Sequence, residues 1–266
     1  VDRLELESDL RGALDRQELH LLYQPVVALD TGVLQGFEAL SRWSHRSRGV
    51  LAPHHFIQLA EDTGLIVAIG RWALNSACDE LSRWHRLAAS GAEGLHSELR
   101  MGINISGSQL EHETFVSDVA AAIERSGAPA DRVVLELTEG TLMRRTSDIL
   151  LKLHALKALG VQLAIDDFGT GYSSLSYLQR FPIDVLKVDK MFVEGIAGAG
   201  SDGALARTIV ALGEMMHVRT LAEGIETWEQ CDALAALCCK FGQGYRFAHP
   251  MRGSEVSGWA AGQAGR

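Results

Sequence analysis

The chain has 266 residues, of which 47% are hydrophobic and 22% charged, a balance typical of a folded globular protein and not of a disordered one. Its formal net charge of −9 argues against a basic face that binds a nucleic-acid duplex. A small phosphate compound remains compatible with this charge if metal ions or local Arg and Lys side chains offset the carboxylates.

The cysteines and the chain ends carry little information on chemistry. Cys78, Cys231, Cys238 and Cys239 form no Cys-x-x-Cys pair, so we interpret them as reduced packing residues of a cytoplasmic domain. No apolar run approaches the roughly 20 residues of a membrane span, so we expect no membrane insertion. Residues 1–16 resemble a helix or linker that follows a possible upstream domain, and residues 17–266 are expected to form the main domain.

Strand-like apolar runs alternate along the chain with segments of helical spacing. The runs are Leu19–Val27, Gly36–Leu40, Arg100–Ile105, Val133–Leu137, Val161–Ile165, Asp184–Val188, Thr220–Ala222 and Phe241–Phe247. Eight strands with intervening helices predict an α/β fold, a single (β/α)₈ barrel of the TIM type with one irregular or antiparallel strand.

Polar residues recur within or at the far end of these apolar runs. They are Glu38, Asn104, Glu136, Asp166, Lys187, Glu223 and Gln243. An open doubly wound sheet would gather ligands mainly from the strands beside one switch point, whereas a closed barrel can point all seven side chains at one spot above its C-terminal rim. The pattern therefore favours the barrel.

Five carboxylates follow or interrupt strands: Glu38, Glu136, Asp166, Asp167 and Glu223. Any one of them could be a solvated strand-end residue, but burying the set together calls for a counter-ion, and metal binding is the usual solution. Oxygen ligands with one amide, Asn104, suit Mg²⁺ or Mn²⁺ and not zinc. Neighbouring side chains of a strand face opposite ways, but where a strand ends and the chain turns, Asp166 and Asp167 can converge on two metals.

Two basic side chains accompany these acids. Alternation places Lys187 and Asp189 on one face, where the lysine could orient an attacking water or could simply pair with Asp189. Arg42 lies four positions after Glu38 and is a candidate for holding a phosphate, with a plain surface arginine as the alternative.

Two glycine-rich segments need separate interpretation. Residues 168–174 follow the Asp pair directly and lack the Gly-Lys-Ser/Thr ending of a nucleotide-binding P-loop, so we interpret them as a loop that holds Asp167. Residues 198–203 match Gly-x-Gly-x-x-Gly, with Glu223 at a suitable distance for a ribose-binding acid. A dinucleotide site needs a strand directly before the first glycine, and the preceding run ends near Val188, so this alternative is disfavoured.

The ordered set of motifs resembles the EAL domain family over roughly residues 17–252. The motifs are Tyr23-Gln24-Pro25, Glu38-Ala39-Leu40-x-Arg42-Trp43, Asn104-Ile105-Ser106, Glu136-Leu137-Thr138-Glu139, Asp166-Asp167-Phe168-Gly169, Leu186-Lys187-Val188-Asp189, Ala222-Glu223-Gly224-Ile225-Glu226 and Gln243-Gly244-Tyr245. The resemblance implies a phosphodiesterase that hydrolyses cyclic di-GMP to the linear dinucleotide 5′-pGpG with two divalent cations, Mg²⁺ or Mn²⁺, and that Ca²⁺ inhibits.

By the same resemblance, Glu38, Asn104, Glu136 and Asp166 would hold one metal, and Asp166 with Asp167 would serve the second. Lys187 would contact the water or phosphate, and Glu223 would be the general base or a second-metal ligand. The remaining implied roles are substrate binding by Arg42, Gln24, Gln243 and Leu40, and support of the loop and the site by Glu139, Asp189 and Glu226.

The alternative from another functional class is a catalytically silent module that senses cyclic di-GMP. A third is a metal-dependent barrel enzyme for some other phosphodiester. Silent relatives usually lack one of the acids, whereas all are present here. The resemblance further implies a homodimer and, in the full-length bacterial signalling protein, an upstream sensory or cyclase-like domain.

Overall fold

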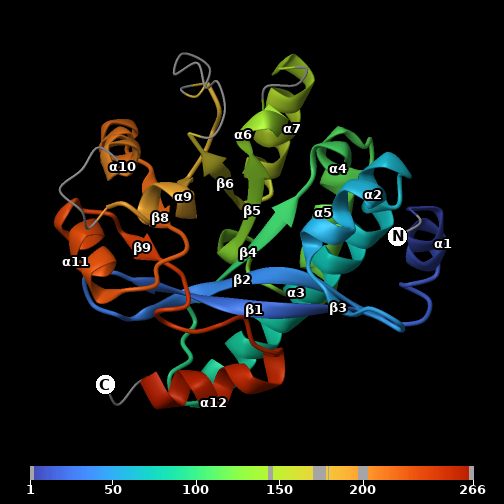
Figure 1. Cartoon of the computed structure of the whole chain (residues 1–266), viewed down its shortest axis with the longest axis horizontal. Helices are drawn as coiled ribbons and strands as arrows, with labels where there is room; N and C mark the ends of the chain where they lie inside the picture. Colours follow the sequence, from blue (N-terminus) through green and yellow to red (C-terminus); the bar gives the residue numbers. More distant parts are fainter. Residues whose placement is uncertain (1–2, 143–145, 170–177, 179, 197–202, 264–266) are drawn as a thin grey trace.

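The computed structural model describes residues 3–142, 146–169, 178, 180–196 and 203–263. Figure 1 shows a strand-built centre surrounded by helices. The strands are β1 (Leu19–Ala28), β2 (Leu34–His45), β3 (Gly49–Leu51), β4 (Arg100–Ile105), β5 (Val133–Thr138), β6 (Gln162–Phe168), β7 (Val185–Val188), β8 (Arg219–Ala222) and β9 (Phe241–Gly242). The helices are α1 (Arg3–Arg11), α2 (Ile57–Asp62), α3 (Ile66–Ala89), α4 (Gly107–Glu111), α5 (Phe115–Ser126), α6 (Glu139–Leu142), α7 (Thr146–Ala158), α9 (Lys190–Val193), α10 (Ala204–Met216), α11 (Trp228–Ala236) and α12 (Gly253–Gln263).

Eight of these strands close into a barrel. The order β1-β9-β8-β7-β6-β5-β4-β2 returns to β1 through a β1–β2 pairing, and β3 only extends the outer end of β2. All neighbours from β2 through β4 to β9 are parallel, whereas β1 is antiparallel to both β2 and β9. The prediction of a (β/α)₈ barrel with one antiparallel strand is confirmed.

The strand bounds differ from the prediction in several places, and β2 and β6 extend to His45 and Phe168, beyond the predicted ends at Leu40 and Ile165. The run predicted as a strand to Phe247 ends at Gly242, because only two residues of β9 pair with β1 and β8. The three-residue strand β3 was not predicted, since it is short and mostly exposed and shows no apolar alternation.

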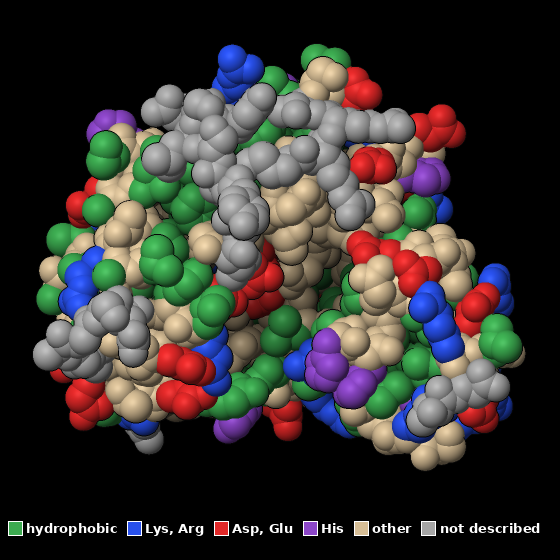
Figure 2. Space-filling model, turned by 45° about the horizontal axis from the view of Figure 1, so that its top comes forward, with side chains coloured by type: hydrophobic (Ala, Val, Ile, Leu, Met, Phe, Trp, Pro, Cys, Tyr) green, Lys and Arg blue, Asp and Glu red, His purple; other side chains and the backbone are tan. Residues whose placement is uncertain are grey.

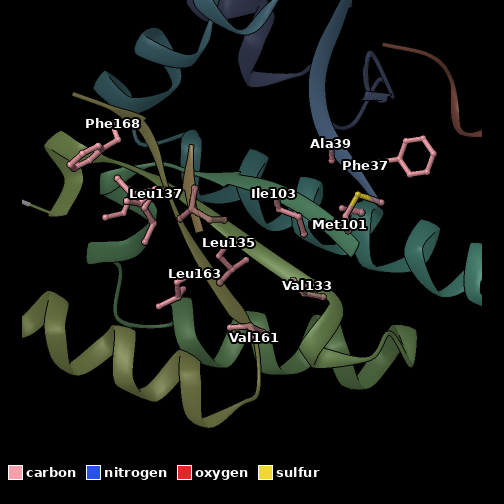
Figure 3. Close-up of a cluster of buried hydrophobic side chains, with 14 of the residues drawn as sticks. Phe37, Ala39, Met101, Ile103, Val133, Leu135, Leu137, Val161, Leu163 and Phe168 are labelled. Atoms are coloured by element: carbon pink, nitrogen blue, oxygen red, sulfur yellow. The ribbon is translucent and has the colours of Figure 1, made fainter. Parts of the chain in front are cut away.

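Alternation along the strands separates two sets of side chains. On β5, Leu135 and Leu137 point outward to the helices, in the cluster drawn in Figure 3, whereas Val134 and Glu136 point into the barrel. A layer of apolar side chains fills the interior midway: Val26, Val134, Ala164, Val185, Leu221 and Phe241. The polar residues at the strand ends, such as Glu136 and Lys187, occupy the next inward-facing position of their strands, two residues beyond this layer.

The N-terminal segment packs against the barrel. Leu10 and Ala13 are buried in a second core cluster with Trp43 of β2 and Phe56. Within the described residues, no helix combines the length and the apolar character needed to cross a membrane.

Candidate active site

Lys187 on β7 is the centre of the polar layer and is 1% exposed. Its Nζ lies 2.6 Å from Glu223 Oε1, 3.1 Å from Asp166 Oδ1 and 3.7 Å from Glu38 Oε1, and it also donates to Glu136 Oε2. These carboxylates come from β2, β5, β6 and the residue after β8, so only barrel closure brings them to one lysine. The alternative of a Lys187–Asp189 ion pair is not found among the described residues.

Glu38 is held by two amide side chains. Asn104 on β4 donates from Nδ2 to Glu38 Oε1 at 2.6 Å, which leaves the Asn104 Oδ1 as an acceptor or metal ligand. Gln243, just after β9, donates to the other oxygen, Glu38 Oε2. Because both amides are neutral, they fix the Glu38 carboxylate without adding a positive charge.

Gly102 provides the space that Glu136 occupies. It lies on β4 two residues before Asn104, facing inward, and a Cβ at this position would overlap Glu136 Oε1. The absence of a side chain here is therefore what allows a full-length glutamate to lie inside the barrel.

A β-bulge brings the two aspartates together. Ile165 pairs with Leu186 but Phe168 pairs with Val188, so β6 has one extra residue between these pairs. Asp167 adopts a left-handed backbone with φ of 51°, and its N–H donates to Asp166 Oδ1 at 3.0 Å. The expectation that the pair converges because the strand ends is wrong, since β6 continues to Phe168; the bulge produces the convergence.

The two aspartates and Glu223 form the strongest candidate metal site. One carboxylate oxygen from each of Asp166, Asp167 and Glu223 lies within 4.8 Å of the others. Oxygen donors at this spacing suit a hard divalent cation.

Three acids of the site, Glu136, Asp167 and Glu223, have raised pKa values. Burial, reinforced by the charges of Glu38 and Asp166 and opposed by Lys187, raises the pKa of Glu136 to about 8. Burial and the neighbouring Asp166 raise the pKa of Asp167 to about 6, and burial also raises that of Glu223 well above its usual range. Burial alone would lower the pKa of Lys187, but the carboxylates outweigh it and hold that pKa well above its usual value. The cluster therefore has more negative charge than one ammonium neutralises.

Two further acids lie outside this cluster and contact the backbone of the loops. Glu139 is buried at the start of α6, and its Oε2 accepts from the Gly169 N–H at 3.1 Å. Asp189 caps α9 by accepting from the Met191 N–H at 2.8 Å, and it shares a hydrogen bond with the Asp167 carboxyl group. Both thus bear on the segment that positions Asp167.

A cleft lies above the acids. Two adjoining cavities of about 790 and 280 Å³ share Glu38, Leu40 and Asp166 in their walls. In Figure 2 the molecule is hollowed at its centre, and acidic side chains (red) line part of the hollow. The cleft is large enough for a dinucleotide.

The predicted substrate residues Gln24 and Arg42, and the predicted supporting residue Glu226, lie at different places around this cleft. Gln24 and Glu226 line the smaller cavity; Gln24 also donates to the Ala248 carbonyl at 3.2 Å, and Glu226 forms an exposed ion pair with Lys190 at 2.6 Å. Arg42 shares a strand face with Leu40 but lines neither cavity, and its guanidinium donates to the Ser41 carbonyl at 2.8 Å.

The cleft includes residues to which the sequence pattern assigned no role. His54, Ile57 and Glu61 line the larger cavity, and Lys190 and Tyr245 line the smaller one. The signal that could have found them is their position: each follows the C-terminal end of a barrel strand, where barrel active sites are built. Residues 170–174 of the predicted Asp167 loop and most of the Gly-x-Gly-x-x-Gly segment, residues 198–202, lie outside the described residues.

Comparison with known proteins agrees with this geometry. The chain is 40% identical over 255 residues to the bifunctional diguanylate cyclase/cyclic di-GMP phosphodiesterase MucR of Pseudomonas aeruginosa, covering 96% of this chain and 36% of MucR. It is 41% identical over 251 residues to the cyclic di-GMP phosphodiesterase NbdA of the same organism, covering 94% of this chain and 31% of NbdA. The chain thus spans about a third of the length of these relatives.

Solved structures give the same result. The structure described as PaMucR phosphodiesterase in complex with c-di-GMP matches with a TM-score of 0.88 and 40% identity, over 95% of this chain and 99% of that one. The EAL enzyme Bd1971, bound to cAMP and cyclic di-GMP, matches with a TM-score of 0.92 and 33% identity, over 97% and 69% of the two chains. A family model for the EAL domain matches residues 7–250, and the chain belongs to the EAL domain family.

Proposed function

We propose that this chain is a phosphodiesterase domain that hydrolyses cyclic di-GMP to 5′-pGpG in the presence of Mg²⁺ or Mn²⁺. The observation that carries the proposal is the ring of four carboxylates around the buried Lys187, open to a cleft of dinucleotide size. The relatives' printed activity and the complex of MucR with c-di-GMP support the choice of substrate.

The donor chemistry fits two divalent cations. Glu38, Glu136 and Asp166 with the Asn104 Oδ1 would hold one, and Asp166 with Asp167 would hold the other. When bound, such cations lower the pKa of water and neutralise charge on a phosphate. The raised carboxyl pKa values support this assignment, because a cation would supply the positive charge that protons supply in its absence.

The chain's own residues would divide the remaining work. Glu223 lies on the cleft side of the ring and would accept the proton of the attacking water or serve the second metal. Lys187, buried and fully charged, would fix the carboxylates and the position of the water. Arg42, Gln24, Gln243 and Leu40 would bind the substrate around the cleft, and Glu139, Asp189 and Glu226 would support the loops.

The test is chromatography of the products of cyclic di-GMP hydrolysis by the wild type and Glu223→Gln, each with Mg²⁺, Mn²⁺, Ca²⁺ or chelator. We expect 5′-pGpG with Mg²⁺ or Mn²⁺ only, and a fall in kcat of about 10²–10⁴-fold in Glu223→Gln with substrate affinity kept. Arg42→Ala should mainly raise KM through a lost phosphate contact. Glu229→Gln, an exposed acid of α11 outside the cleft, is the matched control and should behave as the wild type.

The outcomes separate the competing functions. Wild-type binding of cyclic di-GMP without any product, under either metal, would identify the silent sensor module instead. Product formation at an undiminished rate in excess chelator would contradict the metal-dependent chemistry.

The setting of this domain is part of the proposal. Because the chain spans about a third of MucR and NbdA, we infer that it acts within a longer cytoplasmic signalling protein with an upstream sensory or cyclase-like domain. The homodimer implied by the family resemblance is testable by sedimentation of this chain with and without cyclic di-GMP.

A further inference from the structure

Lys190 is a positively charged residue in the wall of the smaller cavity. It is the first residue of α9, and Asp189 fixes this start by accepting from the Met191 N–H at 2.8 Å. Among the described residues, no other Lys or Arg lines either of the two cavities that form the cleft. The carboxylates in the wall of the smaller cavity are those of Glu38, Asp166, Glu223 and Glu226. A phosphate that enters this cavity therefore meets one cationic side chain among several acids.

The Lys190 side chain reaches the cavity by crossing Gly224, the residue after Glu223. Gly224 has a left-handed backbone with φ of 65°, and a Cβ at this position would lie 2.3 Å from Lys190 Cγ, 2.5 Å from its Cβ and 2.6 Å from its Cδ. A side chain at residue 224 would thus occupy the path of the lysine. The glycine is what allows the lysine to lie over the backbone that carries Glu223.

The ammonium group of Lys190 keeps donors for a ligand. Its Nζ donates to Glu226 Oε1 at 2.6 Å and lies 3.9 Å from Glu194 Oε1, beyond hydrogen-bonding distance. The bond to Glu226 raises the pKa of Lys190, so the side chain is charged at neutral pH. An ammonium has three N–H donors, and the pair with Glu226 is exposed to water, which weakens it. The charge is therefore held in place but remains accessible.

Cyclic di-GMP would bring two negatively charged phosphodiester groups into the cleft, and only one of them would be cleaved. In the function proposed above, divalent cations held at Asp166 and Asp167 offset the charge of the reacting phosphate. The other phosphate is on the opposite side of the dinucleotide ring, so those cations do not neutralise it. Because the acids of the cavity wall repel it, it needs a positive side chain, and Lys190 is the one that the described walls offer.

We propose that Lys190 binds the non-reacting phosphate of the dinucleotide in the smaller cavity. This inference rests on the proposed function, to which it adds a residue that determines substrate affinity. Glu226 and the phosphate then compete for the same ammonium group. Because the packing of the lysine over Gly224 fixes the path of its side chain, weakening the pair with Glu226 frees the charge without displacing it.

The first test compares the kinetics of cyclic di-GMP hydrolysis in the wild type, Lys190→Met and Lys190→Arg. We expect Lys190→Met to raise KM by about tenfold with kcat little changed, and Lys190→Arg to recover most of the loss. The difference in KM should shrink as sodium chloride is added, because salt screens a charge contact but not a packing defect. Lys240→Met, an exposed lysine outside both cavities, is the matched control.

Glu226→Gln separates substrate binding from a structural role of the ion pair. Glutamine keeps an acceptor but removes the charge that competes for Lys190, so we expect KM at or below the wild-type value. If the pair only supports the loop, Glu226→Gln and Lys190→Met should raise KM alike. That result would overturn the proposal.

Calorimetry identifies the phosphate that Lys190 contacts. With Ca²⁺, under which we expect no turnover, 5′-pGpG and GpG are titrated into the wild type and Lys190→Met. Both ligands contain the non-reacting phosphate, so both should lose affinity by the same factor. A loss for 5′-pGpG alone would assign the contact to the reacting phosphate, and no loss for either would remove the contact; each overturns the proposal. These titrations need no hydrolysis, so a wild type that binds both ligands but forms no product would refute the proposed activity and not this contact.

Discussion

Replacing Lys187 with methionine tests whether one buried ammonium holds the acidic ring together. Methionine keeps the length of the side chain and removes its charge, so four carboxylates that now lie within 3.7 Å of Nζ would lose their common partner. The metal-free protein can respond by protonating one more carboxyl group. Protonating a carboxyl group whose unperturbed pKa is near 4.5 destabilises the folded protein by at most about 5 kcal/mol at pH 8 and about 2 kcal/mol at pH 6.

These limits translate into melting temperatures that differ with pH. For a domain of this size, about 2–4 °C per kcal/mol gives a loss of roughly 10–20 °C at pH 8 and roughly 4–8 °C at pH 6, measured by calorimetry in chelator. Lys190→Met is the control, because Lys190 forms only exposed ion pairs and should shift the Tm little. An equal loss at both pH values, or none, would refute the reasoning.

Three further changes probe the supports of the site. Glu139→Ala removes the acceptor for the Gly169 N–H, so we expect weaker metal binding and lower activity, partly restored by high Mg²⁺, in a protein that still folds; a metal titration of activity that matches the wild type would contradict this role. Gly102→Ala places a methyl group against the Glu136 carboxylate and should lower the free energy of unfolding by about 1–3 kcal/mol in urea, whereas Gly140→Ala, with open space around it, should not. Burial raises the folded pKa of Glu136 to about 8 from an unfolded value of 4.5, so its protonated form stabilises the fold. This contribution is complete below about pH 4.5 and falls by about 1.4 kcal/mol per unit as the pH rises to 8. Unfolding of the metal-free protein should show at least that slope, because the raised pKa values of Asp167 and Glu223 act in the same direction, and a stability that rose over this range would contradict it.

Much of the fold follows from local pattern. The run predicted at Arg100–Ile105 coincides with β4, because a central strand buried on both faces is apolar throughout its length except at functional positions. The sequence predicted that one strand would be irregular or antiparallel without saying which one. The antiparallel pairing of β1 with both β2 and β9 shows that it is β1. The end of β9 was missed, since Tyr245 and Phe247 keep the alternate spacing of a strand while the backbone leaves the ladder after Gly242.

The site was predictable as a set of residue types and not as a geometry. Alternation places Glu38, Glu136 and Lys187 on inward faces, but no local signal gives the extra residue in β6 that turns Asp166 and Asp167 together. The bulge depends on pairing with β7, a contact between distant segments.

The seam between β1 and β9, the strand pairing that closes the barrel, affects how the chain folds during synthesis. β1 and β2 share a ladder from Leu19↔Trp43 to Val27↔Leu34, so this hairpin can form once the chain has been synthesised to His45. Its other edge stays unpaired until Phe241 and Gly242 emerge, almost two hundred residues later. Throughout that interval the nascent chain presents an open strand edge, which is a template for pairing with other chains. A product truncated before Phe241 keeps that edge permanently and should aggregate, whereas loss of residues after Gly262 leaves the seam intact.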